Sequence, residues 1–176
     1  MNSSPHNKCL LSLVLLVWAG LQHVEAQPGF VTQVGSPRLL NSASERGILE
    51  LTFLIEDGFH IQPAIVGNDN FIPTLLTVGQ AGGISFGTPV FPVPDSIFGG
   101  FYGYWGTIKV LVPLEVNQGT VSGQYNVAFT FTYQACKDKS CFFPRILNFN
   151  VRLGTEKDSL TLYVGDGQPT DRQPRG

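Results

Sequence analysis

The chain has 176 residues, of which 14% are charged, and its formal net charge is −2 at pH 7. Nucleic acids and anionic membranes are normally bound by clustered Lys and Arg, so this charge balance gives no basis for either kind of partner. A chain of this length fits one domain with a substantial hydrophobic core.

Residues 1–26 have the pattern of a secretory signal peptide. Lys8 lies in a short polar start, an apolar stretch covers residues 10–21, and Ala26 is the small residue that a signal peptidase needs. The apolar stretch is too short to span a bilayer comfortably, and no later apolar run reaches that length. We therefore expect cleavage near Ala26 and a periplasmic or secreted protein without a membrane span; an uncleaved anchor is the alternative.

Apolar and polar residues alternate in several short runs after this leader. Because successive side chains of a strand point to opposite faces, each run predicts a strand with one buried face. The runs cover residues 47–55, 74–78, 84–86, 107–114, 125–133, 146–153 and 159–164. Clusters of Gly and Pro separate them, and no long helical period appears. This pattern predicts an all-β fold, an immunoglobulin-like antiparallel β-sandwich formed by residues 27–164.

Two further segments lack this alternation. Residues 89–105 are rich in Gly, Pro and aromatic side chains. We expect them to form a loop that folds over the edge of the sandwich and completes the core with its aromatic rings. Residues 165–176 are polar and contain Pro169 and Pro174, which predicts a disordered tail.

Cys136 and Cys141 lie between the runs 125–133 and 146–153, which have two of the clearest strand patterns in the sequence. Two such runs joined by a short polar loop predict a β-hairpin, with the cysteines flanking the turn region and close enough to pair. A disulfide that closes so small a ring stabilises the fold by roughly 2 kcal/mol. An exposed pair on a loop is suited to thiol–disulfide exchange. On spacing alone a structural bridge is the commoner outcome for an exported protein, so both interpretations stay open.

His60 is the one histidine that follows the predicted leader. Together with the two cysteines it would supply three ligands for zinc or copper. The spacing fits no standard metal motif and a fourth ligand is not evident, so we expect no metal and no cofactor. A metal-binding periplasmic protein is the weakest of the alternatives. Hydrolytic triads, paired carboxylates and Gly-rich phosphate loops have no support in the sequence.

The segment from Tyr133 to Pro144 resembles the cysteine motif of a known family. That family is the N-terminal periplasmic domain of the thiol:disulfide interchange protein DsbD, also called the disulfide bond corrector domain. Its motif is Tyr-Gln-(Gly/Ala)-Cys, a short polar loop, then Cys, an aromatic residue or Leu, and Pro. Shorter similarities follow the same order upstream, at residues 55–61, 91–94 and 101–103. The resemblance covers roughly residues 46–153.

The resemblance implies an immunoglobulin-like sandwich with a redox-active Cys136–Cys141 pair. Phe101, with Tyr102 and Gly103, would cap the disulfide and shield it from stray thiols. The pocket around the cysteines would contain Phe59, His60 and Gln62. The sequence departs from the family pattern in two places. Gly99 and Gly100 stand where family members have acidic residues, and the loop between the cysteines is one residue shorter.

The function that this resemblance implies is that of an exported thiol–disulfide interchange domain. It would relay electrons through Cys136 and Cys141 to a thioredoxin-fold or similar redox protein, by way of a transient mixed disulfide. The corresponding enzyme class is a protein-disulfide reductase or a component of thiol–disulfide interchange. Family members often carry a membrane conduit and a thioredoxin-like domain. The sequence printed here contains neither, so we expect either that the reductant is a separate protein or that the relay function has been lost. We expect the domain to be a monomer. The alternative is a non-catalytic β-sandwich interaction module with a structural disulfide.

Overall fold

The computed structural model describes residues 29–43, 45–65, 71–97, 101–156 and 159–163. All regular elements in these ranges are β-strands, which confirms the predicted all-β class. The described residues include no helix that could cross a membrane. The predicted leader at residues 1–26 and the predicted tail at 165–176 lie outside the described residues.

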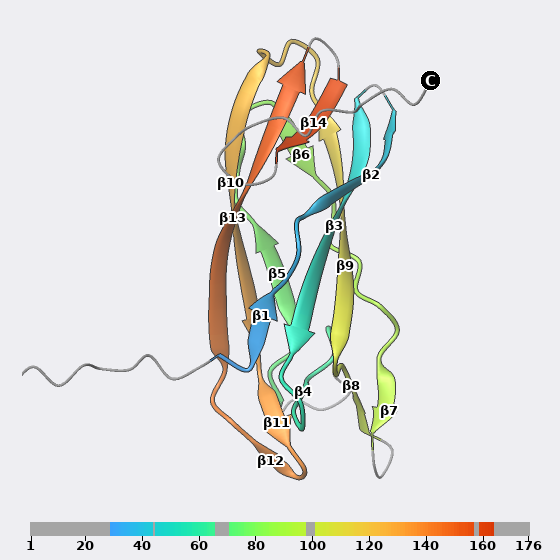
Figure 1. Ribbon diagram of the computed structural model, residues 1–176, viewed down its shortest axis with the longest axis vertical. Helices are drawn as coiled ribbons and strands as arrows, with labels where there is room; N and C mark the ends of the chain where they lie inside the picture. Colours follow the sequence, from blue (N-terminus) through green and yellow to red (C-terminus); the bar gives the residue numbers. More distant parts are fainter. Residues whose placement is uncertain (1–28, 44, 66–70, 98–100, 157–158, 164–176) are drawn as a thin grey trace, which may run out of the picture.

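Two antiparallel sheets face each other and form the predicted immunoglobulin-like sandwich (Figure 1). The first sheet has the order β1-β3-β9-β6, with β2 also paired to β3. Its strands are β1 (Val31–Gln33), β2 (Arg38–Ala43), β3 (Arg46–Ile55), β6 (Ile84–Phe86) and β9 (Thr107–Val116). The second sheet has the order β14-β13-β10-β5. Its strands are β5 (Leu75–Val78), β10 (Gly123–Tyr133), β13 (Arg145–Glu156) and β14 (Ser159–Tyr163).

The core lies between these sheets and is formed by the inward faces that the alternation predicts. Most of the large and fully buried side chains come from β3, β9 and β10: Leu49, Leu51, Phe53, Ile55, Val110, Val112, Val127, Phe129 and Phe131, each at most 1% exposed. Phe53 of the first sheet stacks on Phe131 of the second, with ring centroids 4.2 Å apart. Burial of each such side chain stabilises the fold by about 1.5–3 kcal/mol, so the interior of the sandwich dominates its stability.

Two small sheets lie together at one end of the sandwich, at the bottom of Figure 1. One has the order β12-β11-β4 and consists of β4 (His60–Ile61), β11 (Ala135–Lys137) and β12 (Ser140–Cys141). The other is a ribbon of β7 (Asp95–Ile97) and β8 (Phe101–Gly103). A β-bridge between Ile61 and Tyr104 joins the two along the free edge of β4. This end of the molecule therefore brings residues 60–62, 101–104 and 135–141 together.

The prediction that residues 89–105 contain no strand is wrong. β7 and β8 lie in this segment, and Val90 forms a β-bridge with Leu111 of β9. Each of the two strands has only three residues, too few for alternation to appear in the sequence. The hairpin of β10 and β13 is confirmed, but its connection is more than a polar loop, since β11 and β12 form a second, smaller hairpin at its tip.

Candidate functional site

Cys136 and Cys141 form a disulfide across the small hairpin of β11 and β12. The two residues are directly opposite each other in the antiparallel register, followed by the pair Lys137 and Ser140. Asp138 begins the turn with a φ of 53°. Asp tolerates this left-handed conformation better than most residues, which allows the chain to reverse within two residues. Local chain geometry thus brings the two sulfurs together.

The two cysteines differ in their access to solvent. Cys136 is 1% exposed, because β11 is the middle strand between β12 and β4. Cys141 is exposed, because β12 is an edge strand at the end of the molecule. The sequence had led us to expect an exposed pair, and for Cys136 this expectation is wrong. The difference arises from the pairing with β4, which lies far away in the sequence and covers Cys136.

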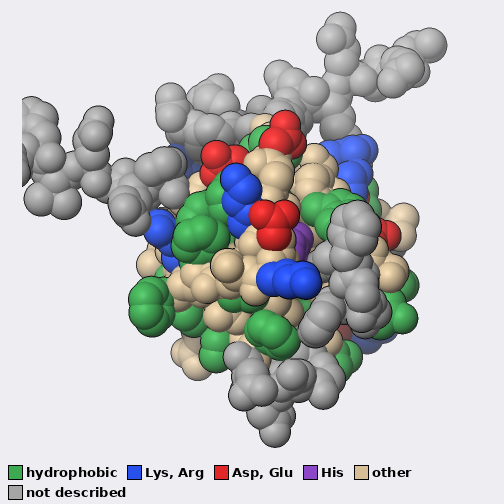
Figure 2. Space-filling model, turned by 90° about the horizontal axis from the view of Figure 1, so that it is seen from below, with side chains coloured by type: hydrophobic (Ala, Val, Ile, Leu, Met, Phe, Trp, Pro, Cys, Tyr) green, Lys and Arg blue, Asp and Glu red, His purple; other side chains and the backbone are tan. Residues whose placement is uncertain are grey.

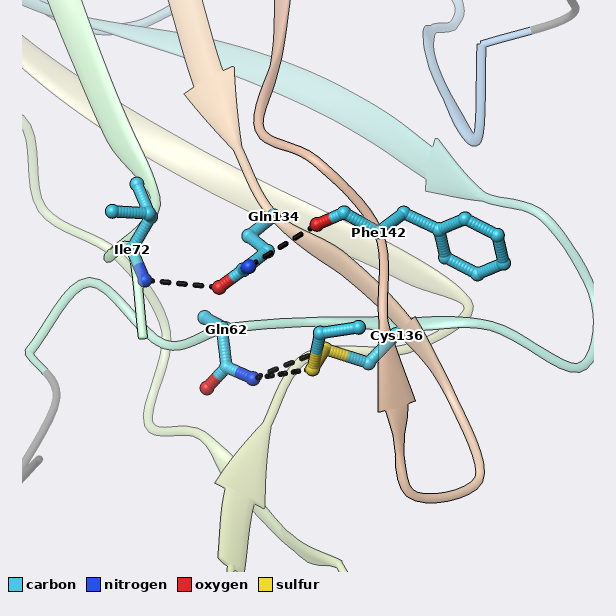
Figure 3. The surroundings of a disulfide bond; sticks show 6 residues. Gln62, Ile72, Gln134, Cys136 and Phe142 are labelled. Carbon is cyan, nitrogen blue, oxygen red and sulfur yellow. Dashed lines mark hydrogen bonds between the residues drawn. A yellow bond between two sulfur atoms is a disulfide. The ribbon is translucent and has the colours of Figure 1, made fainter. Parts of the chain in front are cut away.

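Gln62 contacts the disulfide through its side-chain amide (Figure 3). Its Nε2 lies 3.2 Å from Sγ of Cys136 and 3.7 Å from Sγ of Cys141. The residue is only 8% exposed. Its backbone N–H donates to the carbonyl of Gln134 at 3.1 Å, and its own carbonyl accepts a hydrogen bond from the hydroxyl of Thr74. The amide that faces the sulfurs is therefore attached to a fixed backbone.

Gln134 holds the base of the cysteine hairpin, a role that the sequence did not indicate (Figure 3). Its Nε2 donates to the carbonyl of Phe142 at 3.1 Å, and its Oε1 accepts from the N–H of Ile72 at 3.0 Å. The backbone N–H of Phe142 in turn donates to the carbonyl of Ala135 at 2.8 Å. These bonds connect both sides of the hairpin base with the segment that precedes β5.

Three phenylalanines form an aromatic cluster beside Cys141, made of Phe30, Phe59 and Phe142. The ring centroid of Phe30 lies 4.6 Å from that of Phe59 and 4.8 Å from that of Phe142. The guanidinium of Arg145 lies over Phe30 at 4.7 Å, and the ammonium of Lys137 lies over Phe59 at 5.6 Å. These distances are typical of cation–π contacts. The cluster fixes the hairpin to the ends of β1 and β3, and Phe30 gave no signal in the sequence because only the tertiary fold places it here.

His60 lies opposite Cys136 in the pairing of β4 with β11. Burial lowers the pKa of its imidazole below the ordinary value, and the nearby charge of Asp138 opposes this shift in part. The neutral imidazole is thus the favoured form at pH 7. No three His, Cys, Asp or Glu side chains of the described residues are grouped so as to hold a metal ion.

The backbone of the segment predicted to cap the disulfide lies next to this site. Residues 101–103 form β8, which continues into the bridge between Tyr104 and Ile61. Tyr102 is 57% exposed and Gly103 is buried. The side chain of Phe101 and the residues Gly99 and Gly100 lie outside the part of the chain that the structure describes, so the cap itself stays a prediction.

Charges of both signs lie side by side at this end of the molecule, with hydrophobic side chains between them (Figure 2). Exposed Lys137, Asp138 and Lys139 follow one another in the turn of the hairpin. Phe143 is 91% exposed and lies two residues after Cys141. A partner that approaches Cys141 therefore meets apolar surface and short-range charges rather than a field of one sign.

No family model and no curated protein matches the sequence. The solved structures that are similar to the chain include two periplasmic or N-terminal domains. The N-terminal domain of DsbD from Neisseria meningitidis, in the reduced form, is 19% identical; the match covers 68% of this chain and 86% of that one, with a TM-score of 0.35. The N-terminal periplasmic domain of ScsB from Proteus mirabilis is 11% identical; the match covers 75% of this chain and 54% of that one, with a TM-score of 0.42. The chain spans about half the length of the ScsB domain that it matches.

Replacement of both cysteines by Ser is expected to leave the fold intact. The small ring accounts for roughly 2 kcal/mol, so we expect the free energy of unfolding to fall by at most about 2–3 kcal/mol in urea denaturation. The hydrogen bonds of Gln134 and the aromatic cluster hold the hairpin without the S–S bond. A double variant that no longer folds would show that the disulfide is chiefly structural.

The lowered pKa of His60 predicts a dependence of stability on pH. Above pH 6.5 the imidazole is neutral in both the folded and the unfolded chain. Below this value the unfolded chain binds a proton that the folded chain does not bind, so the stability falls with pH until the lowered pKa of the folded state is reached. Thermal melts between pH 7.5 and 5.5 should show this fall, and His60→Gln should show a smaller one. An equal fall in both proteins would assign the effect to other groups.

Proposed function

We propose that this protein is an exported thiol–disulfide interchange domain that reacts through Cys136 and Cys141. The observation that carries the proposal is the unequal exposure of the two cysteines. Cys141 is exposed on an edge strand, whereas Cys136 is 1% exposed. Exchange requires a thiolate to approach one sulfur of the disulfide along the S–S bond, and only Cys141 offers such an approach.

The reaction proceeds in two steps. A partner thiolate attacks Sγ of Cys141, a bond forms between these two sulfurs, and the Cys136–Cys141 bond breaks with its electron pair on Sγ of Cys136. A second thiolate of the partner then attacks the partner's first sulfur, which is bonded to Cys141 in the mixed disulfide. This forms a disulfide within the partner and releases Cys141 as a thiolate. The partner is oxidised by two electrons and the domain is reduced. In the reverse direction the reduced domain passes two electrons to an oxidised partner.

The site favours a folded protein partner over a small thiol. Cys141 is bordered by the aromatic cluster and by Phe143, so a partner with an apolar rim around its own cysteine gains contact area there. A thioredoxin-fold protein is the partner class that the cysteine segment implies, and the predicted leader places the encounter outside the cytoplasm, where disulfides persist. We infer that the domain acts as a monomer that meets its donor and its acceptor in turn.

The reduction potential of the Cys136–Cys141 pair tests this proposal most directly. Titration of the mature protein against glutathione and thioredoxin buffers is expected to give a potential above about −300 mV. The single variants provide the matched control. The free Cys141 of Cys136→Ser should form a mixed disulfide with oxidised glutathione about tenfold faster than the buried Cys136 of Cys141→Ser. A potential well below about −300 mV, or equal rates for the two variants, would overturn the proposal.

A cap at Phe101 belongs to the same proposal. It is supported by the resemblance of residues 101–103 and by the position of β8 next to β4, which flanks the cysteine hairpin. An aromatic ring against sulfur is worth about 0.3–1.5 kcal/mol. This is enough to keep a segment closed most of the time and still allow a partner to displace it.

Phe101→Ala is therefore expected to speed the reduction of the disulfide by dithiothreitol. It should change the free energy of unfolding far less than Phe129→Ala, because Phe129 is 1% exposed in the core and its truncation costs about 3–5 kcal/mol. Reduction rates of the parent and of Phe101→Ala, with urea melts of the parent and of both variants, make this comparison. An unchanged rate together with a large loss of stability would assign Phe101 to the ordinary core.

A non-catalytic interaction module is the second candidate function. Thr132 of β10 pairs with Leu75 on one side and with Ile146 on the other, and these apolar side chains are 56% and 63% exposed. They form a short apolar row on the outer face of the second sheet, where an alternating strand normally carries polar residues. A reduction potential of the Cys136–Cys141 pair in the range of structural disulfides would favour this function, in which the disulfide only stabilises the hairpin.

A further inference from the structure

We propose that Gln62 is a catalytic residue of the exchange reaction, because its side-chain amide hydrogen bonds the sulfur of Cys136 as that sulfur leaves the disulfide. This inference rests on the proposed function and adds a group that stabilises the charge formed in the first step. It uses the order of events that the unequal exposure of the two sulfurs implies, with Cys141 attacked and Cys136 expelled.

The geometry supports this role because the amide is closer to the buried sulfur. Nε2 of Gln62 lies 3.2 Å from Sγ of Cys136 and 3.7 Å from Sγ of Cys141. When the partner thiolate attacks Cys141, a full negative charge develops on Sγ of Cys136, which is 1% exposed. Water has little access to this sulfur, so the charge has to be stabilised by the protein itself. A hydrogen bond to an ionised acceptor is roughly twice as strong as one to a neutral acceptor, so the contact strengthens as the bond breaks.

The amide is held in position before the reaction begins. The backbone of Gln62 donates to Gln134 and accepts from Thr74, and the preceding Ile61 pairs with Ala135 on one side and Tyr104 on the other. Gln62 therefore follows a segment that is held on both edges, and it lies opposite Gln134, two residues before Cys136 in the facing strand. A donor that needs no rearrangement stabilises the developing charge at the lowest cost in free energy.

The negative charge on Cys136 is stabilised by Gln62 rather than by the ionisable groups nearby. His60 is opposite Cys136, and its burial favours the neutral imidazole. Lys137 follows Cys136 on an exposed position and directs its ammonium over the ring of Phe59. Asp138 is exposed in the turn and carries a negative charge that opposes thiolate formation. Gln62, by contrast, directs a donor at the sulfur.

The same contact acts when the reduced domain donates electrons. The mixed disulfide between Cys141 and the partner is then resolved by the thiolate of Cys136, which attacks Sγ of Cys141 and expels the partner as a thiolate. Hydrogen bonding by Gln62 raises the fraction of Cys136 that is ionised for this step. Loss of the amide lowers the ionised fraction of Cys136, so this step also slows at a pH below the pKa of the thiol.

Gln62→Leu removes the donor while keeping a side chain of similar size. In the Cys141→Ser background we expect the pKa of the Cys136 thiol, measured by thiolate absorbance, to rise by about one unit. In the disulfide form we expect reduction by dithiothreitol to slow about three- to tenfold, because a more basic thiolate is a poorer leaving group. Gln62→Glu should raise the pKa of the thiol further, since its carboxylate repels the thiolate.

Gln134→Leu is the matched control, because it removes a buttress of the same hairpin but no contact with sulfur. We expect the pKa of Cys136 to stay within a few tenths of a unit of the parent value in this variant. An equal rise in the Gln134→Leu and Gln62→Leu variants would overturn the proposal in favour of a structural role. A well-folded Gln62→Leu protein with the parental pKa and the parental rate would also overturn it, whereas the reduction potential would then still test the exchange function separately.

The unaltered protein provides a measurement that does not depend on the folding of a variant. The side-chain amide resonance of Gln62 in the reduced domain should shift with pH along the titration curve of the Cys136 thiol, followed by nuclear magnetic resonance. A resonance that does not follow this curve would overturn the proposal.

Discussion

The pairing of β10 with β13 is the constraint on which the site depends. The register is continuous from Gly123 opposite Thr155 to Tyr133 opposite Arg145, so the two strands reach the end of the sandwich together. The inward faces of these strands are buried in the core, and a slip of one residue would turn them toward solvent. The same register therefore fixes where residues 134–144 leave the sheet and where the cysteine hairpin begins.

The position of the hairpin relative to the sandwich is set by contacts from other parts of the chain. β4 covers one edge of β11, Gln134 bridges the two sides of the hairpin base and the segment before β5, and the aromatic cluster ties Phe142 to the start of the first sheet. These contacts come from different segments of the chain, which meet at one end of the molecule (Figure 1). They explain why a hairpin of two very short strands is held in one arrangement, since an isolated hairpin is only marginally stable.

This arrangement makes the two sulfurs chemically different. A hairpin in solution would expose both cysteines to about the same degree. The addition of β4 buries Cys136 and places the amide of Gln62 against its sulfur, while Cys141 stays on the free edge. Burial disfavours a thiolate and a hydrogen bond favours it, so the amide offsets part of the penalty that burial imposes. Reactivity at this disulfide is thus a property of the assembled end of the sandwich.

The sequence by itself determined the sandwich and the proximity of the cysteines. Both depend on local patterns: alternation marks the inward faces of β3, β9 and β10, and two strands with a short connection place Cys136 near Cys141. Only the tertiary structure decided which sulfur is buried, how the amide of Gln62 contacts it, and that Phe30 borders the site. The ribbon of β7 and β8 was missed for a related reason, since its strands are too short to show a period. The contacts that place Gln62 and Phe30 at the site join segments more than seventy residues apart, and such contacts leave no periodic signal in the chain.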